Sequence, residues 1–369
     1  MTGKILFDVT KTCKQSHYSG VLRVSNCLKE ELKNALGDRL VEVVWSDRKQ
    51  TFKAPSYGSK FSIEPEDVFL TAELFSDFER PGIEAFLGSE RCRSYAIFHD
   101  AIPLRHPEFT WPHSVQRHPS YMKMLSRFDG VFAVSAHSSI VLEEYWEWLG
   151  YEYAPSVKSI QLGANGLFPD PIRSSRPLVR PFDVLMLGII EKRKGQDIAL
   201  DACNRLWDEG LEFNLHVVGR ANPYFGKDIE KRIKRMERNG RPVRLHGHLE
   251  DEALKALMGR MSLMLFSSRA EGCGLPVLES LWCGLPVLSS KLAPTRETSR
   301  FGGCCFFNNE DPEAMAEQLK RLFENPHLLV ELYEGIQFDL LPKWSDTARE
   351  ILDTICPEVS SQLPANADH

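Results

Sequence analysis

The sequence predicts an α/β protein built from two doubly wound domains. Short apolar runs typical of buried strands recur along the chain and alternate with helix-length segments, which is the rhythm of parallel sheets. With 369 residues the chain is long enough for two such domains. Residues 168–182 are rich in proline and arginine and carry little apolar periodicity, so we place a domain boundary near residue 175.

The composition describes a soluble globular protein. Hydrophobic residues make up 43% of the chain and charged residues 26%, and the formal net charge of −6 gives no indication of nucleic-acid binding. No apolar run reaches the roughly 18 residues of a membrane-spanning helix, and the first residues lack a signal-peptide layout. The nine cysteines include no C-x-x-C pair, which predicts free thiols in a reducing compartment. We therefore expect a cytoplasmic protein.

The first domain opens with a βα unit. Residues 4–9 form a β-rich run, and Gly20 precedes a helical pattern that continues through Leu28 and Leu32. Open α/β sheets bind ligands at the carboxyl ends of their strands, so the loop with Gly20 is placed to approach a ligand. A plain turn accounts for this glycine equally well.

Further strands are predicted at residues 41–45, 67–71, 94–98 and 130–134. His99 and Asp100 follow the third of these strands directly, where a titratable pair would meet a ligand, although an ordinary turn is the alternative. Ser135 follows the fourth strand and either caps the next helix or touches an acceptor; we favour capping.

The second domain begins with a buried strand at residues 183–187, followed by Gly188 and a loop that ends in a helix from about residue 196. Arg193 and Lys194 stand just before that helix, so their charges and its N–H groups are placed to meet one diphosphate. A solvated charge cluster is the alternative. The next strand, residues 214–218, ends at Gly219, which leaves room for a base or ribose or simply forms a turn.

The segment 264–290 carries the most chemistry per residue. A buried strand at residues 263–266 is followed by a glycine loop, a helix with Pro276 at its start and Gly284 at its end, and a second strand at 286–290.

Two carboxylates and two glycines stand close together in this segment. Gly272 and Gly274 allow a ligand close to the backbone N–H groups, which suits phosphate oxygens or sugar hydroxyls. Glu271 and Glu279 accept hydrogen bonds only, which suits hydroxyl groups. A nucleotide sugar offers both diphosphate and hydroxyls, so the combination favours it over ATP.

Glu271 and Glu279, separated by seven residues around GCGLPVL, resemble the E-x7-E signature of retaining glycosyltransferases of the GT-B fold, family 4 or group 1. The opening DV and SGVLRV and the run HDAIPLRHPEF are similar to a polysaccharide-building branch of that family. The loop GIIEKRKG resembles the family's G-x-x-E-P-R-K-G phosphate loop, except that Ile189 and Lys192 depart from it.

The resemblance implies two Rossmann-like domains that face each other across a cleft. It assigns residues 1–170 to the acceptor-binding domain, 171–181 to a linker and 182–344 to the nucleotide-sugar domain. A C-terminal helix at 345–356 is expected to cross back to the first domain, and residues 357–369 are expected to be disordered.

The resemblance also implies roles for individual residues. Glu279 is matched to the glutamate that binds ribose, Glu271 to the one near the sugar ring, and Lys194 with Arg193 to the cations on the diphosphate. The other donor contacts are expected from Gly20, Gly188 and Gly219, from the N–H groups of Gly272, Cys273, Gly274 and Leu275 toward the sugar, and from that of Leu278 toward a phosphate. His99 is expected to fix the sugar or acceptor, with Asp100 as a helper and Ser135 as a further acceptor contact.

The predicted function is retaining transfer of a hexose from a nucleotide-diphosphate sugar to a growing polysaccharide or lipid-linked glycan. UDP-glucose is the first choice of donor and GDP-mannose the second. The sequence contains no D-x-D run, so we expect no metal and no cofactor. A nucleotide-sugar epimerase and a non-catalytic binding scaffold are the alternatives. The basic run at residues 227–244 leaves open a weak peripheral contact with the inner face of the membrane.

Overall fold

The structure, a computed structural model, describes residues 3–14, 19–55, 62–173 and 178–360. The chain divides into two compact units: Met1–Gly163 together with Pro342–His369, and Ala164–Leu341. The second unit thus starts earlier than the expected linker. Hydrogen bonds give the reason, because Ile172 donates its N–H to the carbonyl of Trp282 at 2.9 Å, and the Trp282 indole donates to the carbonyl of Phe168 at 3.0 Å.

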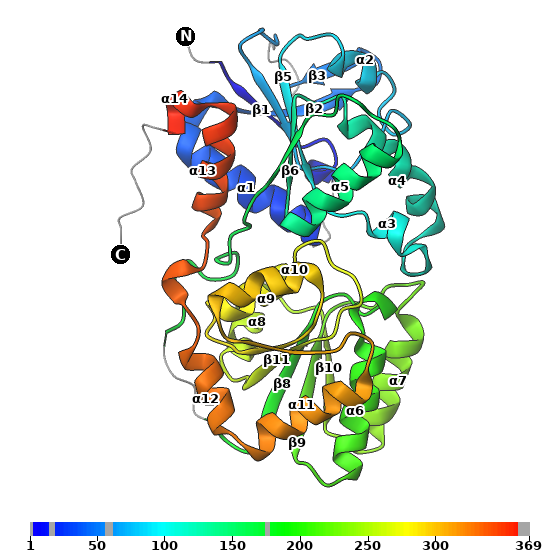
Figure 1. Ribbon diagram of the computed structural model, residues 1–369, viewed down its shortest axis with the longest axis vertical. Helices are drawn as coiled ribbons and strands as arrows, with labels where there is room; N and C mark the ends of the chain where they lie inside the picture. The colour runs from blue at the N-terminus through cyan, green and yellow to red at the C-terminus, as the bar shows by residue number, and fades with distance from the viewer. Residues whose placement is uncertain (1–2, 15–18, 56–61, 174–177, 361–369) are drawn as a thin grey trace. The chain divides into compact units, whose positions relative to one another are not determined.

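The first unit is organised around a mostly parallel sheet (Figure 1). Its strands are β1 Ile5–Asp8, β2 Leu40–Ser46, β3 Thr51–Lys53, β4 Val68–Thr71, β5 Arg93–Phe98, β6 Gly130–Ala133 and β7 Ser156–Ser159. They lie in the order β3-β2-β1-β4-β5-β6-β7, and only the pairing of β2 with β3 is antiparallel among the described strands. The sheet therefore reverses its winding between β1 and β4.

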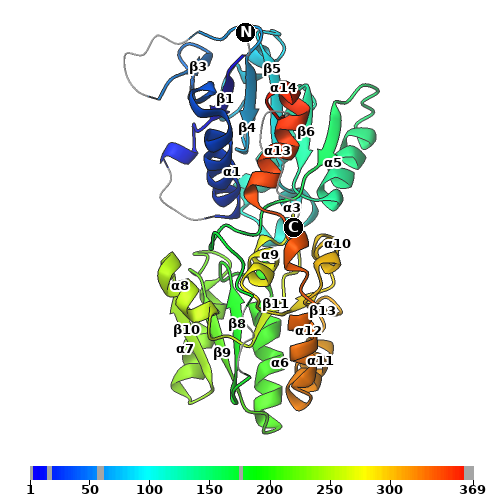
Figure 2. The same ribbon diagram turned by 90° about the vertical axis from the view of Figure 1, so that its left-hand side faces the viewer.

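Helices cover both faces of this sheet. They are α1 Gly20–Leu36, α2 Ile83–Leu87, α3 Ile102–Arg105, α4 Pro112–Leu125, α5 Ala136–Trp148, α13 Trp344–Ile355 and α14 Pro357–Ser360. One face packs its apolar side chains with those of α2, α4 and α5 in a single core. Helix α1 lies beside α13, which comes from the C-terminal part of the chain (Figures 1 and 2).

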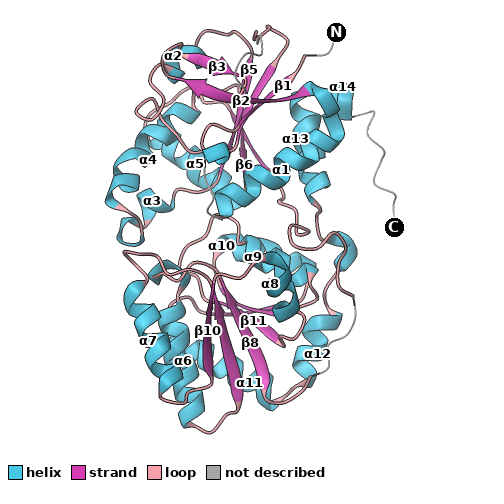
Figure 3. Cartoon of the chain, turned by 180° about the vertical axis from the view of Figure 1, so that it is seen from behind, coloured by secondary structure: helices cyan, strands magenta, loops and turns pink. Residues whose placement is uncertain are grey.

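The second unit repeats the doubly wound pattern with a parallel sheet in the order β10-β9-β8-β11-β12-β13 (Figure 3). Its strands are β8 Phe182–Leu187, β9 Phe213–Val218, β10 Val243–Gly247, β11 Leu263–Phe266, β12 Val287–Ser290 and β13 Cys304–Phe307. Its helices are α6 Gln196–Asp208, α7 Lys227–Arg238, α8 Asp251–Met258, α9 Leu275–Trp282, α10 Ala293–Glu297, α11 Pro312–Glu324 and α12 His327–Glu334. Side chains of α6, α7 and α11 share one apolar core with the sheet.

Short 3-10 helices join several of these elements. They are η1 Thr12–Lys14, η2 Gly37–Arg39, η3 Pro107–Phe109, η4 Lys192–Lys194, η5 Thr298–Phe301 and η6 Phe338–Leu340. Of these, η1 follows β1 and η4 follows β8, so each occupies the first loop after the first strand of its unit.

The predicted fold class is confirmed, with two corrections. Strands β3, β7 and β13 were not predicted. Strand β3 has three residues, and β7 is a polar strand at the sheet edge with largely exposed side chains. The expected disordered tail is wrong for Pro357–Ser360, which form α14 against α13, and residues 361–369 lie outside the described part of the chain. None of the helices in the described residues has the length and apolar character needed to cross a membrane.

Candidate active site

The predicted phosphate loop follows β8, and the backbone around it is tightly packed. Gly188 and Gly219 both have positive φ, at 142° and 148°, and a Cβ on Gly219 would lie 1.8 Å from the carbonyl oxygen of Gly188. Gly219 therefore has to be glycine for the two strand-end loops to approach each other. This packing explains the glycine without a ligand, and contact of Gly219 with a base or ribose remains a prediction.

Arg193 and Lys194 lie in η4, and Gly195 turns the chain from η4 into α6. Gly195 has a φ of 68°, and a Cβ there would stand 1.9 Å from the carbonyl oxygen of Ser267. The Ser267 hydroxyl in turn donates to the carbonyl of Lys194 at 2.9 Å. The loop is thus fixed against the end of β11, beside the glycine loop that precedes α9.

The structure brings both predicted cations to Glu271. Nζ of Lys194 lies 2.5 Å from Oε1 of Glu271, and Nη1 of Arg193 lies 3.6 Å from the same oxygen. The side chains of Lys194 and Glu271 are only 12% and 9% exposed. An ammonium group has three N–H donors, and the bond to Glu271 uses one of them. Glu271 thus orients the positively charged side chains of Lys194 and Arg193.

The ionisation of this cluster follows from its burial and its charges. Burial would raise the pKa of Glu271, but the charges of Lys194 and Arg193 outweigh it and hold the pKa below its usual value. Burial lowers the pKa of Lys194, and Glu271 offsets only part of that shift. Glu271 is therefore an ionised hydrogen-bond acceptor at neutral pH and is unsuited to act as a general acid.

Glu191, Gln196 and Asn222 support the cluster, and sequence reasoning gave none of them a role. Oε1 of Glu191 accepts from Nε of Arg193 at 2.9 Å, and its Oε2 accepts from the Asn222 amide at 2.8 Å. The Gln196 side chain bonds the N–H of Glu191 and the carbonyl of Ile189. Glu191 is the glutamate of the G-x-x-E-P-R-K-G pattern, so the sequence could have indicated its role. No motif in the sequence pointed to Asn222.

The glycine loop of the motif leads into α9 as predicted. Gly274 has a φ of 81° and precedes the first helical residue, Pro276 occupies the first turn, and Gly284 has a φ of 62° just after the helix. The side chains of Leu275 and Leu278 are buried, so only their backbone can face a ligand. The remaining predicted contacts are Gly272, Cys273 and Glu279. Burial raises the pKa of the Cys273 thiol to about 12. Glu279 lies on α9 and is 1% exposed.

In the first unit His99 and Asp100 lie at the carboxyl end of β5. The His99 ring is buried, and its Nε2 donates to the carbonyl of Ala72 at 2.8 Å. Burial lowers the pKa of His99, so the ring is neutral at pH 7. Oδ1 of Asp100 accepts the N–H of Ile102 at 2.9 Å. His99 is thus paired with the loop after β4 and Asp100 with its own loop, and the contact of either with an acceptor remains a prediction.

Ser135 and Gly20 both stand at the start of a helix. The Ser135 hydroxyl accepts the N–H of Ser138 at 3.0 Å, which confirms the predicted capping of α5. Gly20 is the first residue of α1, and a Cβ there would meet no atom within 4 Å among the described residues. The described residues therefore supply no packing reason for a glycine at position 20.

Two doubly wound units, the second carrying a glycine loop at a helix start beside a buried lysine, arginine and glutamate, define a GT-B protein. Residues 181–325 match the family model described as glycosyl transferases group 1. This matched segment lies within the second unit, which is thus similar to the group 1 glycosyltransferases, and the fold of the chain is that of GT-B proteins. Among the described residues no group of three His, Cys, Asp or Glu side chains is arranged to hold a metal ion.

Similar proteins extend this picture. The serotype-specific mannosyltransferase WbdA of Escherichia coli is 25% identical over 312 residues, which are 76% of this chain and 36% of WbdA, so the chain spans about a third of that relative. Sucrose-phosphate synthase from Thermosynechococcus elongatus has a TM-score of 0.72 at 15% identity, covering 98% of this chain and all of that one. HepE of Anabaena in complex with UDP and glucose has a TM-score of 0.69 at 18% identity over the same shares.

Proposed function

We propose that this protein transfers a hexose, with retention of anomeric configuration and without a metal ion, from a nucleotide-diphosphate sugar to a growing polysaccharide or lipid-linked glycan. The observation that carries the proposal is the contact of Lys194 with Glu271, with Arg193 beside them. It joins two motifs 77 residues apart into one site with two cations and an ionised acceptor.

The chemistry of transfer fits these groups. Breaking the anomeric bond places negative charge on the departing nucleotide diphosphate, and fixed cations at Arg193 and Lys194 stabilise it without reorganisation. The N–H groups at the start of α9 add donors at the positive end of a helix. Glu271, held ionised by the same cations, accepts hydrogen bonds from sugar hydroxyls. Glu279 on α9 is assigned to the ribose.

For the transferred sugar we propose mannose, with glucose as the alternative. Sequence reasoning alone ranks UDP-glucose first because UDP-hexoses are common. The similarity to WbdA, a mannosyltransferase by name, reverses that order in favour of GDP-mannose. HepE, which was solved with UDP and glucose, shares the fold and keeps UDP-glucose as the comparison donor. We propose a cytoplasmic location, with any membrane contact weak and peripheral.

The test begins with donor binding. A thermal-shift screen should show stabilisation by one nucleotide sugar, by about 2.7 kcal/mol at roughly 100 times its dissociation constant. Transfer to oligosaccharide acceptors should then proceed in EDTA, with NMR of the product showing the anomeric configuration of the donor retained. Lys194→Met should lower the rate of transfer about a hundredfold, whereas Lys192→Met, at the exposed neighbouring lysine, should leave it unchanged. Conversion of the donor without an acceptor would instead identify an epimerase, and binding without transfer a scaffold.

A further inference from the structure

The reversal of winding in the first sheet places a ligand site between β1 and β4. From β1 the chain moves to β2 on one side, and β4 lies on the other side of β1. In open α/β sheets the crevice outside the carboxyl ends of strands at such a switch point is where ligands bind. Here that position is occupied by residues that neither the predicted site nor the proposed function uses.

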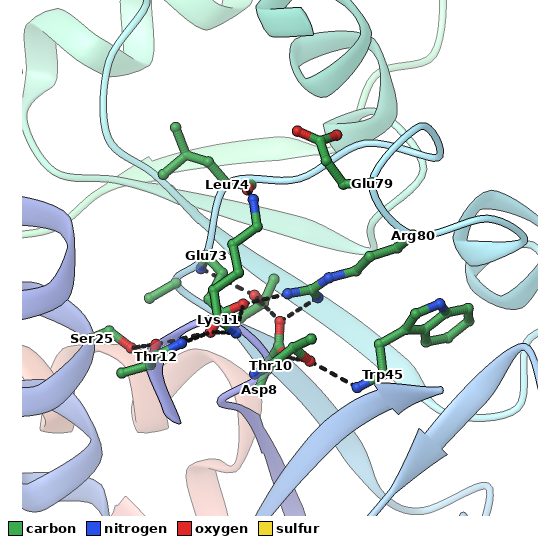
Figure 4. A network of polar contacts seen from close by, with 12 residues as sticks. Asp8, Thr10, Lys11, Thr12, Ser25, Trp45, Glu73, Leu74, Glu79 and Arg80 are labelled. Carbon is green, nitrogen blue, oxygen red and sulfur yellow. Dashed lines mark hydrogen bonds and ion pairs between the residues drawn. The ribbon is translucent and has the colours of Figure 1, made fainter. Parts of the chain in front are cut away.

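A buried arginine organises this position (Figure 4). Nη1 of Arg80 lies 2.6 Å from Oδ2 of Asp8, at the end of β1, and Nη2 pairs with Glu73, just past β4. All three side chains are almost fully buried. Glu73 also accepts the N–H groups of Lys11 and Thr12, each at 2.7 Å. The network therefore ties the loop after β1 to the loop after β4.

A cavity of about 260 Å³ opens beside this network, and its walls include Trp45, Asp47, Glu79 and Arg80 together with Lys11 and Lys14. Ligand pockets usually measure about 300 to 1,000 Å³. The volume thus accommodates a single sugar ring and is too small for a whole nucleotide sugar.

The lining offers donors, acceptors and an aromatic wall together. No acceptor among the described residues bonds Nε1 of Trp45 or Nε of Arg80, although both atoms are buried. Both atoms lack accessible surface, so a ligand in the cavity would meet the other polar groups of the lining. Asp47 and Glu79 supply carboxylates that accept from hydroxyl groups, and the lysine ammonium groups donate.

The charges of the lining select a neutral ligand. Two cations, Lys11 and Lys14, face two carboxylates, Asp47 and Glu79. Arg80 is paired with two further carboxylates, Asp8 and Glu73, so the lining has no excess of positive charge. A phosphate or carboxylate would gain little here, whereas a ring with several hydroxyls could use the donors and the acceptors and rest on the indole.

We propose that this cavity of the first unit is a binding site for one neutral hexose unit, built by Trp45, Asp47, Lys11 and Glu79 around the Arg80 network. Naming that hexose as a unit of the acceptor glycan rests on the proposed function; the binding itself does not.

The test measures binding of methyl α-mannopyranoside and methyl α-glucopyranoside to the full chain by ligand-observed NMR and calorimetry, with glucose 6-phosphate as the anionic comparison. Asp47→Asn and Trp45→Phe should each weaken binding of the neutral sugar about tenfold, which corresponds to about 1.4 kcal/mol. Asp38→Asn, at another exposed aspartate outside the cavity, is the matched control and should leave binding unchanged. Asp47 is exposed, so its variant is expected to fold.

In transfer assays the same two variants should raise KM for an oligosaccharide acceptor and leave KM for the nucleotide sugar unchanged. Preference for glucose 6-phosphate, or unchanged binding of the neutral sugar in both variants, would overturn the inference. Sugar binding without any nucleotide-sugar binding would refute the proposed function and leave this site standing. Nucleotide-sugar binding and transfer without binding in the cavity would do the reverse.

Discussion

Replacing Lys194 by methionine removes the cation nearest to Glu271 and keeps the length of the side chain. The carboxylate is buried, and its remaining cation, Arg193, lies 3.6 Å away. Breaking a buried ion pair from one side usually costs about 3 to 5 kcal/mol, because a charge is left uncompensated. Since Arg193 stays close, we expect the lower end, about 3 kcal/mol in the free energy of unfolding.

The rate of transfer should fall as well, by about a hundredfold, because removing one fixed donor to a developing negative charge costs about 3 kcal/mol. Urea unfolding and initial rates at saturating donor measure the two effects on one preparation. Adding Glu271→Gln to Lys194→Met should restore part of the stability and none of the rate, because the double variant has no unpaired charge and still lacks the cation.

Additive effects of the two substitutions on stability, within about 0.5 kcal/mol, would show that the ion pair contributes no coupling and would refute the reasoning. A double variant with near-normal turnover would remove Lys194 from the leaving-group site. Lys192→Met controls for loss of a lysine from the same loop, since that side chain is exposed.

Three further predictions use single substitutions. Gly20→Ala should leave the unfolding transition intact, because a Cβ there meets no described atom, and should weaken donor binding in a titration if the loop contacts the donor; unchanged binding would remove Gly20 from the site. Gly219→Ala should destabilise the fold more than Gly210→Ala, as urea midpoints will show, because both have positive φ but only Gly219 faces a carbonyl at 1.8 Å. His99 has a pKa lowered by burial, so its contribution is present above about pH 6.5 and is lost as the unfolded chain takes up a proton below it. The free energy of unfolding, measured by urea at pH 7.5 and 5.5, should therefore change less with pH in His99→Gln than in the parent protein, by up to about 1.4 kcal/mol per unit of pKa shift. An unchanged pH dependence would contradict the buried neutral ring.

The site in the second unit could be predicted largely from the sequence because its parts are local. Gly188, the charged pair at Arg193 and Lys194 and the glycine loop before α9 each follow a strand, and parallel strands bring their carboxyl ends to one edge of the sheet. The direct contact of Lys194 with Glu271 could not be predicted, because it depends on the side-chain geometry of two loops 77 residues apart in the chain.

The Arg80 network escaped prediction for a related reason. Asp8 ends an apolar strand and belongs to the DV opening, but no partner was predicted for it, and Arg80 stands 72 residues later in a loop with no recognisable motif. They become partners only because β1 and β4 lie side by side in the folded sheet. His99 illustrates the opposite case: its position after β5 was predicted, but its burial against Ala72 was not.

The return of α13 to the first unit sets an order on the synthesis of this chain. The second unit is continuous in sequence, from Ala164 to Leu341, so it has all its residues once that stretch has left the ribosome. The first unit is still incomplete at that point, because α1 packs against α13, which has not yet been made. Gly163 also packs closely on Trp344: a Cβ on Gly163 would lie 2.3 Å from the backbone nitrogen of Trp344. The first unit is therefore completed only after the second unit has been made, and until then α1 lacks its contact with α13.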